Sequence, residues 1–422
     1  MNKIFNIKKI FLAHFKLFAL TIIFFLANES KAQSLEDFQV LAAENNLELK
    51  AQYKAFEAKL EEVTQAKSWQ DPNLSFGYFI SPIETRVGPQ IARFSLSQKL
   101  PWFGTFKAKG DVATKKAEFE YEKFQNQKMK LFLQVAKQYY DISVLRSLEK
   151  IEQQQLKVLD DLKSMIEVQY ENDQAKLVDV LRIDLEIDDQ KTAIQVIKDQ
   201  EKAQVSKLNS ILNRQLKTPI EITNPELVLE QDLMFEADSV SENHPRLQAI
   251  QRLKESNLAE AELVKKQNMP QFGFGLDYAI IQNRNVMNAD AGQDAIMPML
   301  SVSLPIFGKK NKSREKLITL QGKSVDFQLE NERNLLENEI QISRYKQNEL
   351  NNLLDLYNQQ ITTLEDILEL SEAALANANM EIEEVLRLYE KQLIYKKQRI
   401  KTLAELQKIN QTLRYLTSNL LP

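Results

Sequence analysis

One pattern occurs twice in this chain. Residues 46–104 and residues 244–308 each pass from a polar helical stretch through two short alternating segments to a Leu-Pro-x-Phe-Gly turn. Pro72 and Pro270 hold equivalent places 198 residues apart, and the second copy has six more residues between its two prolines. A long stretch with helical periodicity follows each copy. The chain must therefore fold from two repeats that each combine a little strand with much helix.

Residues 1–32 have the features of a signal peptide. Four lysines precede an apolar run, and Ser30 and Ala32 place small side chains at the −3 and −1 positions of a cleavage site before Gln33. A membrane anchor is the alternative, but Lys16 interrupts the apolar run. We therefore expect an exported chain from which the leader is removed.

Composition excludes several classes of function. With no cysteine in 422 residues, the chain has no disulfide, no thiolate metal site and no cysteine-linked lipid. His14 lies in the leader, and His244 precedes a proline at a helix start, where we expect it to cap the helix or to be solvated. The net charge of −4 becomes more negative without the basic leader, which argues against a nucleic-acid partner. We expect no metal site, no cofactor and no enzymatic activity, because the many carboxylates lie on periodic helical faces and not in a pocket.

Four short segments alternate between apolar and small or polar side chains. They predict hairpins over residues 73–100 and 271–304, the first with a loop at 82–90. Seven apolar residues form the faces that we expect to contact lipid: Leu74, Phe76, Tyr78, Phe272, Phe274, Leu276 and Tyr278. Trp69 and Trp102 flank one end of the first hairpin, where an aromatic girdle is expected. A soluble half-buried hairpin is the alternative, but aromatic outer faces favour a membrane barrel wall.

Helical periodicity fills most of the rest. We predict a helix over residues 35–68, and two stretches of roughly 70 residues, from Phe103 and from Lys309, would each reach about 100 Å as helices. Heptad spacing predicts coiled-coil packing of Leu145, Leu148, Leu159, Leu162, Ile166, Leu350, Leu354, Tyr357, Ile361, Leu364 and Leu368. The polar gaps at Glu152 and Gln155 predict a helix face that meets water.

Each long helix turns back in a tight helical hairpin. The tips lie near residues 172–178 and 377–383. The first repeat then spans residues 33–217, a linker covers 218–243, and the second repeat spans 244–422. The predicted fold is mainly α, with long coiled-coil helices and four strands per chain.

Four membrane strands cannot form a closed barrel. Open sheet edges are not tolerated in lipid, and the smallest barrels have eight strands. Two copies would give a packed barrel with little lumen, whereas three copies would give twelve strands and a pore. We therefore expect the chain to oligomerise, and with three copies the barrel would be continuous with a helical tube and form a conduit.

The order of helix, hairpin, long helix and helical tip occurs twice, with Val-Asp-Val-Leu at residues 178–181 of the first tip and Glu-Glu-Val-Leu at residues 383–386 of the second. This layout resembles the outer-membrane efflux protein family typified by TolC. The resemblance covers essentially the whole mature chain. It implies a homotrimer with a twelve-stranded β-barrel in the outer membrane of a Gram-negative bacterium and an α-helical barrel in the periplasm, which together act as a passive export duct. It also implies two partners, a periplasmic adaptor (membrane fusion) protein and an inner-membrane pump of the RND or ABC type. A periplasmic or secreted coiled-coil scaffold without channel activity is the alternative.

The resemblance also points to gate residues at the tips. In the family, the second tip reads Val-Asp-Val-Leu-Asp, and its two aspartates form acidic rings that close the periplasmic entrance. Here Glu384 takes the place of the first aspartate and Arg387 replaces the second, which departs from a double acidic ring. Asp179 and Arg182 hold the equivalent spacing in the first copy. The alternative for all four residues is that they are solvated charges at the end of a hairpin and have no role in gating.

The sequence leaves the cargo open between metal cations, drugs and secreted proteins. The two Leu-Pro-x-Phe-Gly turns resemble the heavy-metal, RND-associated branch of the family. Met287, Met297 and Met299 gather near the second hairpin, and thioethers bind Cu(I). Methionine more commonly serves as an apolar filler.

Overall fold

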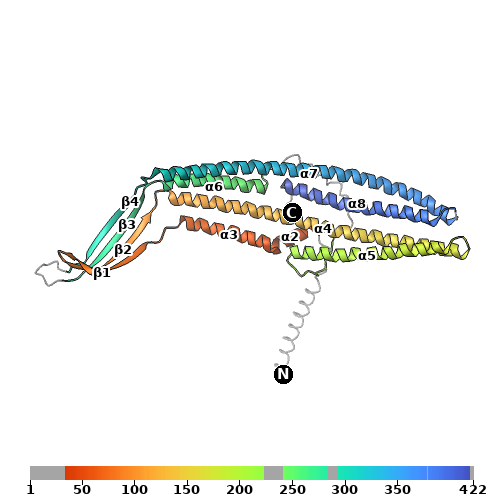
Figure 1. Cartoon of the computed structure of the whole chain (residues 1–422), viewed down its shortest axis with the longest axis horizontal. Coiled ribbons are helices and arrows are strands. Elements are labelled where there is room, and N and C mark those ends of the chain that lie inside the picture. Colours follow the sequence, from red (N-terminus) through yellow and green to blue (C-terminus); the bar gives the residue numbers. More distant parts are fainter. Residues whose placement is uncertain (1–33, 223–240, 284–291, 378, 419–422) are drawn as a thin grey trace, which may run out of the picture. The chain divides into compact units, whose positions relative to one another are not determined.

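The computed structural model describes residues 34–222, 241–283, 292–377 and 379–418 (Figure 1). The predicted signal peptide, most of the predicted linker and Met287 lie outside these residues. The described chain is mainly helical and contains one four-stranded antiparallel sheet, which confirms the predicted fold class. It divides into two compact units, which we call the sheet unit (Glu48–Gln127 and Val240–Asn338) and the tip unit (Met1–Leu47, Lys128–Ser239 and Glu339–Pro422).

The sheet unit is built around strands in the order β1-β2-β3-β4, all antiparallel (Figure 1). The strands are β1 (Asn73–Thr85), β2 (Gly88–Leu100), β3 (Gln271–Ile281) and β4 (Ala295–Ser303). Their register places apolar side chains in continuous rows across the sheet. One such row runs Phe76, Phe94, Tyr278 and Ile296. All seven residues predicted to contact lipid lie on this apolar face, and most of its large side chains are exposed.

The first hairpin turns more tightly than predicted. The loop expected at residues 82–90 is wrong, because only residues 86–87 separate β1 from β2. Pro82 fits inside the edge strand because the pairing register shifts between Tyr78 and Ile83, which leaves the proline outside the regular ladder. Gly88 makes the turn with φ of +136°, and a Cβ there would lie 2.3 Å from the Gln282 carbonyl oxygen. The tight turn therefore requires glycine.

Helices complete the sheet unit. They are α3 (Leu47–Lys67), α6 (Pro245–Gln267) and the first parts of α4 (Thr105–Glu171) and α7 (Gly308–Ala376). The predicted cap of α6 is confirmed, since the Arg246 backbone N–H donates to His244 Nδ1 at 3.2 Å. Between α4 and α6, Lys115 pairs with Glu255 at 2.9 Å.

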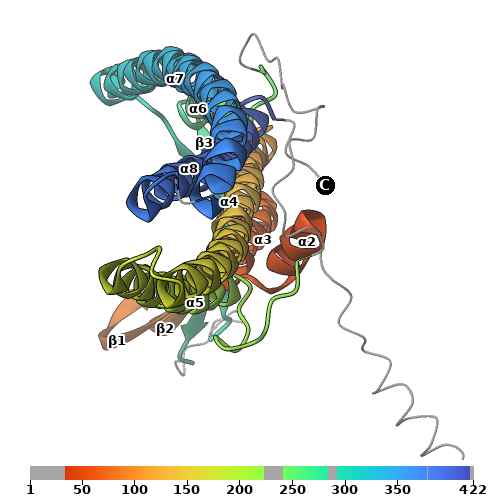
Figure 2. The ribbon, with the colours of Figure 1, turned by 90° about the vertical axis from the view of Figure 1, so that its right-hand side faces the viewer.

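The tip unit is a layer of helices in the order α5, α4, α8 and α7, with α5 and α7 at its two edges (Figure 2). Helices α5 (Leu177–Ile211) and α8 (Ile382–Leu416) are the return arms of the two helical hairpins, and α2 (Leu35–Asn45) packs on the layer. Polar contacts join neighbouring helices in that order: Lys163 with Asp184, Lys408 with Asp141, and Arg399 with Asn358.

The heptad positions form the core of this layer. All five predicted residues of α4 are buried, and so are Leu350, Leu354, Leu364 and Leu368 of α7. The prediction that Glu152 and Gln155 mark a water-facing stripe is wrong, because both are buried. Glu152 is only 1% exposed because Lys397 of α8 and Gln190 of α5 cover and pair its carboxylate.

The single helix predicted over residues 35–68 is also wrong. The chain breaks at Asn46, which has an extended ψ of 124° between α2 and α3. The Asn46 side chain donates from Nδ2 to the Ile211 carbonyl at 3.0 Å, so tertiary contact with the end of α5 holds the break.

In the part of the chain that the structure describes, every helix is too polar or too short to span a bilayer.

Candidate functional site

The turn of the first helical hairpin is held by backbone capping. The Gln174 N–H donates to the Gln169 carbonyl at 2.8 Å, and Asp173 between them takes a left-handed φ of 58°. The return helix α5 then begins with the Lys176 N–H donating to Asp179 Oδ2 at 3.0 Å. Asp179 therefore has a defined structural task at the start of its helix.

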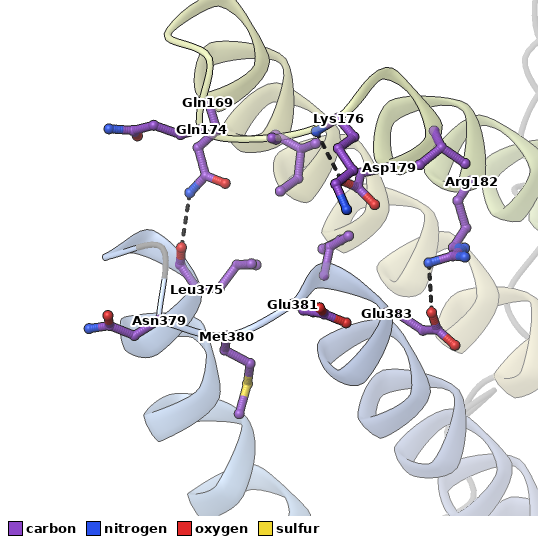
Figure 3. A pocket seen from close by; sticks show the side chains of 14 residues that line it. Gln169, Gln174, Lys176, Asp179, Arg182, Leu375, Asn379, Met380, Glu381 and Glu383 are labelled. Atoms are coloured by element: carbon purple, nitrogen blue, oxygen red, sulfur yellow. Dashed lines mark hydrogen bonds and ion pairs between the residues drawn. The ribbon is translucent and has the colours of Figure 1, made fainter.

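Two contacts join the first tip to the second (Figure 3). Gln169 Nε2 at the end of α4 donates to the Leu375 carbonyl at the end of α7, at 2.9 Å, in a buried position. Arg182 Nη1 in α5 donates to Glu383 Oε2 in α8 at 3.0 Å in a more exposed position. Each contact pairs one repeat with the other.

An apolar core supports these contacts. It draws on all four helices of the layer and consists of Leu159, Leu162, Ile166, Ile183, Ile187, Leu368, Leu375, Ile382, Val385, Leu386 and Tyr389. The Tyr389 hydroxyl also hydrogen-bonds to the Glu372 carboxylate. The two tips are therefore anchored in one packed core, so polar contacts at the surface can change without unfolding the hairpins.

A cavity of about 500 Å³ opens between the tips. Arg182, Asp179, Glu381 and Glu383 line it beside apolar side chains such as Met380 (Figure 3). The tip thus presents side chains of both charges around one opening.

A second cavity of about 320 Å³ lies between α4, α5 and α8 and shares Arg182 and Glu383 with the first. Glu186, Arg387 and Glu390 also line it. Partial burial, reinforced by the negative charges of Glu390 and Asp189, raises the pKa of Glu186 above its ordinary value. This cavity therefore brings Glu186 and Glu390 close together beside the arginines Arg182 and Arg387.

The structure brings the four predicted tip residues into the same region. Arg182 lines both cavities and Arg387 lines the second, whereas Glu384 lies exposed on the first turn of α8. Sequence reasoning missed Glu383 and Gln169, the partners that join the repeats. The sequence does show that Glu383 is acidic, like its neighbour Glu384. Which of the two faces α5 depends on where α8 begins, and the sequence alone does not give that position.

Trp69 precedes β1 and Trp102 follows β2, so both lie at the same end of this antiparallel strand pair. Trp69 packs against Phe106 with ring centroids 5.5 Å apart, and Trp102 stacks on Phe272 at 5.9 Å. Trp69 is 66% exposed, so an apolar surface remains open at this end of the sheet.

Residues 40–214 match the outer membrane efflux protein family. The resemblance to the outer membrane efflux protein family is thereby confirmed, and the match covers most of the first repeat. No curated protein sequence matches the chain significantly.

Solved structures of outer membrane proteins and channels share the fold of this chain over nearly its whole length. CusC superposes with a TM-score of 0.74 at 12% identity, covering 91% of each chain. VceC from Vibrio cholerae gives 0.71 at 13% identity over 91% of this chain and 95% of that one. The MtrE channel of Neisseria gonorrhoeae gives 0.69 at 12% identity, over 92% and 89%.

Among the described residues, no group of three or more acidic or histidine side chains is arranged to hold a metal ion.

Proposed function

We propose that this chain is the outer membrane channel of a tripartite efflux system. Three copies form a twelve-stranded β-barrel in the outer membrane and a helical barrel in the periplasm. Cargo passes through passively, and an inner-membrane pump of the RND or ABC type supplies the energy through a periplasmic adaptor protein. The family match and the shared channel fold support this function.

The observation that carries the proposal is that each unit of the chain has two unlike open edges. In the sheet, β1 of the first repeat and β4 of the second repeat are the edge strands. Open edges with an exposed apolar face cannot remain unpaired in lipid. Pairing of β1 in one copy with β4 in the next satisfies both edges and repeats until the ring closes.

The tip unit also has two unlike edges, and these edges are helices. Its edge helix α5 exposes Leu177, Leu181 and Leu185, and its other edge helix α7 exposes Tyr345 and Leu370. Stripes of this kind on two different faces favour head-to-tail association, in which each copy uses both faces. In both units, one edge element belongs to the first repeat and the other to the second repeat.

We propose the tips as the gate at the periplasmic end. The Arg182–Glu383 pair acts as a latch between the repeats, and Glu384 and Arg387 add charge at the same opening. Asp179 positions the start of α5. The aromatic pair Trp69 and Trp102 lies at the membrane interface, and the apolar face of the sheet contacts lipid.

Membrane fractionation and planar-bilayer recording test the channel. We expect the mature protein in the outer membrane fraction, soluble only with detergent, migrating as a heat-modifiable trimer and conducting ions. A protein that purifies without detergent and conducts nothing would instead support the periplasmic or secreted scaffold. Identification of an adaptor and pump encoded beside this chain would test the tripartite assembly.

A further inference from the structure

A charged pair lies on the face of the sheet opposite the apolar face. The register places Ser75, Ser95, Asp277 and Met297 in one row. The adjacent row on the same face contains Gly77, Arg93, Ala279 and Ala295. Arg93 and Asp277 form an ion pair between neighbouring strands of this face.

The pair is unequal in exposure. Asp277 is only 2% exposed, whereas the Arg93 side chain is 41% exposed. A carboxylate with so little access to water needs a counter-charge, because burial of an unpaired charge is strongly unfavourable. Arg93 therefore both neutralises Asp277 and covers it.

Small neighbours leave the arginine room to do this. Gly77 is the direct cross-strand partner of Arg93, and a Cβ placed there would meet no atom within 4 Å. Gly275 lies two residues from Asp277 on the same face of β3. The guanidinium is thus bordered by space on one side and by the carboxylate on the other.

The rest of this face carries little charge. Between the register shift in β1 and the opposite end of the described sheet, the charged residues that the pairing assigns to this face are Arg93, Asp277 and Lys99. Lys99 lies six residues from Arg93 along β2, opposite Gly273. Arg93 and Asp277 are therefore the groups that set the charge of the middle of the face.

We propose that Arg93 and Asp277 are specificity-determining residues that keep the lumen of the barrel neutral at their level, so that small ions of either sign pass. This rests on the proposed function, in which the polar face lines a water-filled pore. Three copies place three such pairs around the lumen, where rings of uncompensated charge would select ions by sign. Screening extends over about 10 Å at 0.1 M salt, so an unpaired charge on the wall acts well into the pore.

Reversal potentials in a KCl gradient across a planar bilayer test the proposal. Asp277→Asn leaves three arginines and shifts the reversal potential toward that of chloride. Arg93→Gln leaves three carboxylates and shifts it toward that of potassium. The double variant, which loses both charges, returns to the wild-type value, and Ser95→Ala on the same face is the uncharged control.

Opposite shifts of the single variants with recovery in the double variant support the pair. Conducting channels whose reversal potentials do not change, or change in the same direction, overturn it and leave the channel function intact. A wild-type protein that conducts nothing overturns the proposed function and this inference with it. If one single variant fails to assemble, the other single variant and the exchanged pair Arg93→Asp with Asp277→Arg decide the matter, since the exchanged pair should match the wild type.

Discussion

Arg182 and Glu383 meet across the two repeats, although 201 positions separate them in the chain. Their side chains are 38% and 61% exposed, and Nη1 lies 3.0 Å from Oε2. An ion pair so open to water contributes about 0.2–1 kcal/mol. A contact of that strength suits a latch, because thermal motion and a partner protein can both open it.

Removal of the latch should open the channel. We expect Glu383→Gln to raise the open probability in planar bilayers by up to about fivefold, which corresponds to about 1 kcal/mol. Glu384→Gln, one residue away, should shift the reversal potential in a KCl gradient toward that of chloride and leave the open probability unchanged. Equal effects of the two variants on open probability would refute the latch, and a Glu384 variant with wild-type selectivity would remove that residue from the gate.

Glu152 should be far more important for stability than any surface pair. Its Oε1 lies 2.5 Å from Lys397 Nζ, and its Oε2 accepts from Gln190 Nε2 at 2.5 Å. Removal of one partner of a buried ion pair costs about 3–5 kcal/mol. We expect Lys397→Met to lower the midpoint of chemical unfolding strongly. The control Asp199→Asn, which breaks an exposed pair with Lys202 on α5, should leave the midpoint nearly unchanged, and similar losses in both variants would contradict this assignment.

The stability of the tip should increase as the pH falls below neutral. Partial burial and the nearby charge of Glu390 raise the pKa of Glu186, so the folded state binds a proton more readily than the unfolded state does. The stabilising contribution is present below the unfolded pKa and is lost as pH rises through the folded pKa. Hydrogen exchange of residues 177–190 between about pH 5 and 7.5 measures it.

Glu186→Gln provides the matched comparison for this pH dependence. We expect slower exchange than in the wild type at neutral pH, and a weaker response of exchange to pH after correction for the intrinsic rate. Glu390→Gln should act in the same direction by removing one of the neighbouring charges. If both variants keep the full pH dependence of hydrogen exchange seen in the wild type, Glu186 is not the source of that dependence.

The two glycines of the first hairpin should tolerate alanine very differently. Gly88→Ala combines an unfavourable φ of +136° with a Cβ 2.3 Å from the Gln282 carbonyl oxygen, so we expect a loss of at least about 1 kcal/mol and less heat-modifiable trimer. Gly77→Ala meets no atom within 4 Å and should assemble normally. Equal trimer yields from the two variants would show that the turn rearranges.

Periodicity predicted most of the elements, because it reports which face of each helix or strand is buried. We could predict the helices α4 and α7 from their heptads, and the strand β3 from its alternation, without knowing which elements pack against them. The loop at residues 82–90 was misjudged because Pro82 is a turn signal on its own, yet an edge strand with a register shift accommodates it.

Contacts between the repeats could not be predicted in the same way. Glu152 looks like a gap in a heptad until Lys397 of the other repeat is placed beside it. The choice of Glu383 over Glu384 depends on the stagger of α8 against α5, which a single helical pattern does not contain. Sequence indicates that the tips carry charge, and tertiary packing decides which charges pair.

The unlike edges of the sheet have a genetic consequence. A copy whose β1 edge is blocked, for instance by a proline in place of Phe76, still presents an intact β4 to a neighbour. Under the proposed head-to-tail assembly, such a copy in a cell that expresses both forms enters a growing ring and stops its closure. Alleles that damage one edge should therefore be dominant over the wild type, whereas alleles that damage both edges should be recessive.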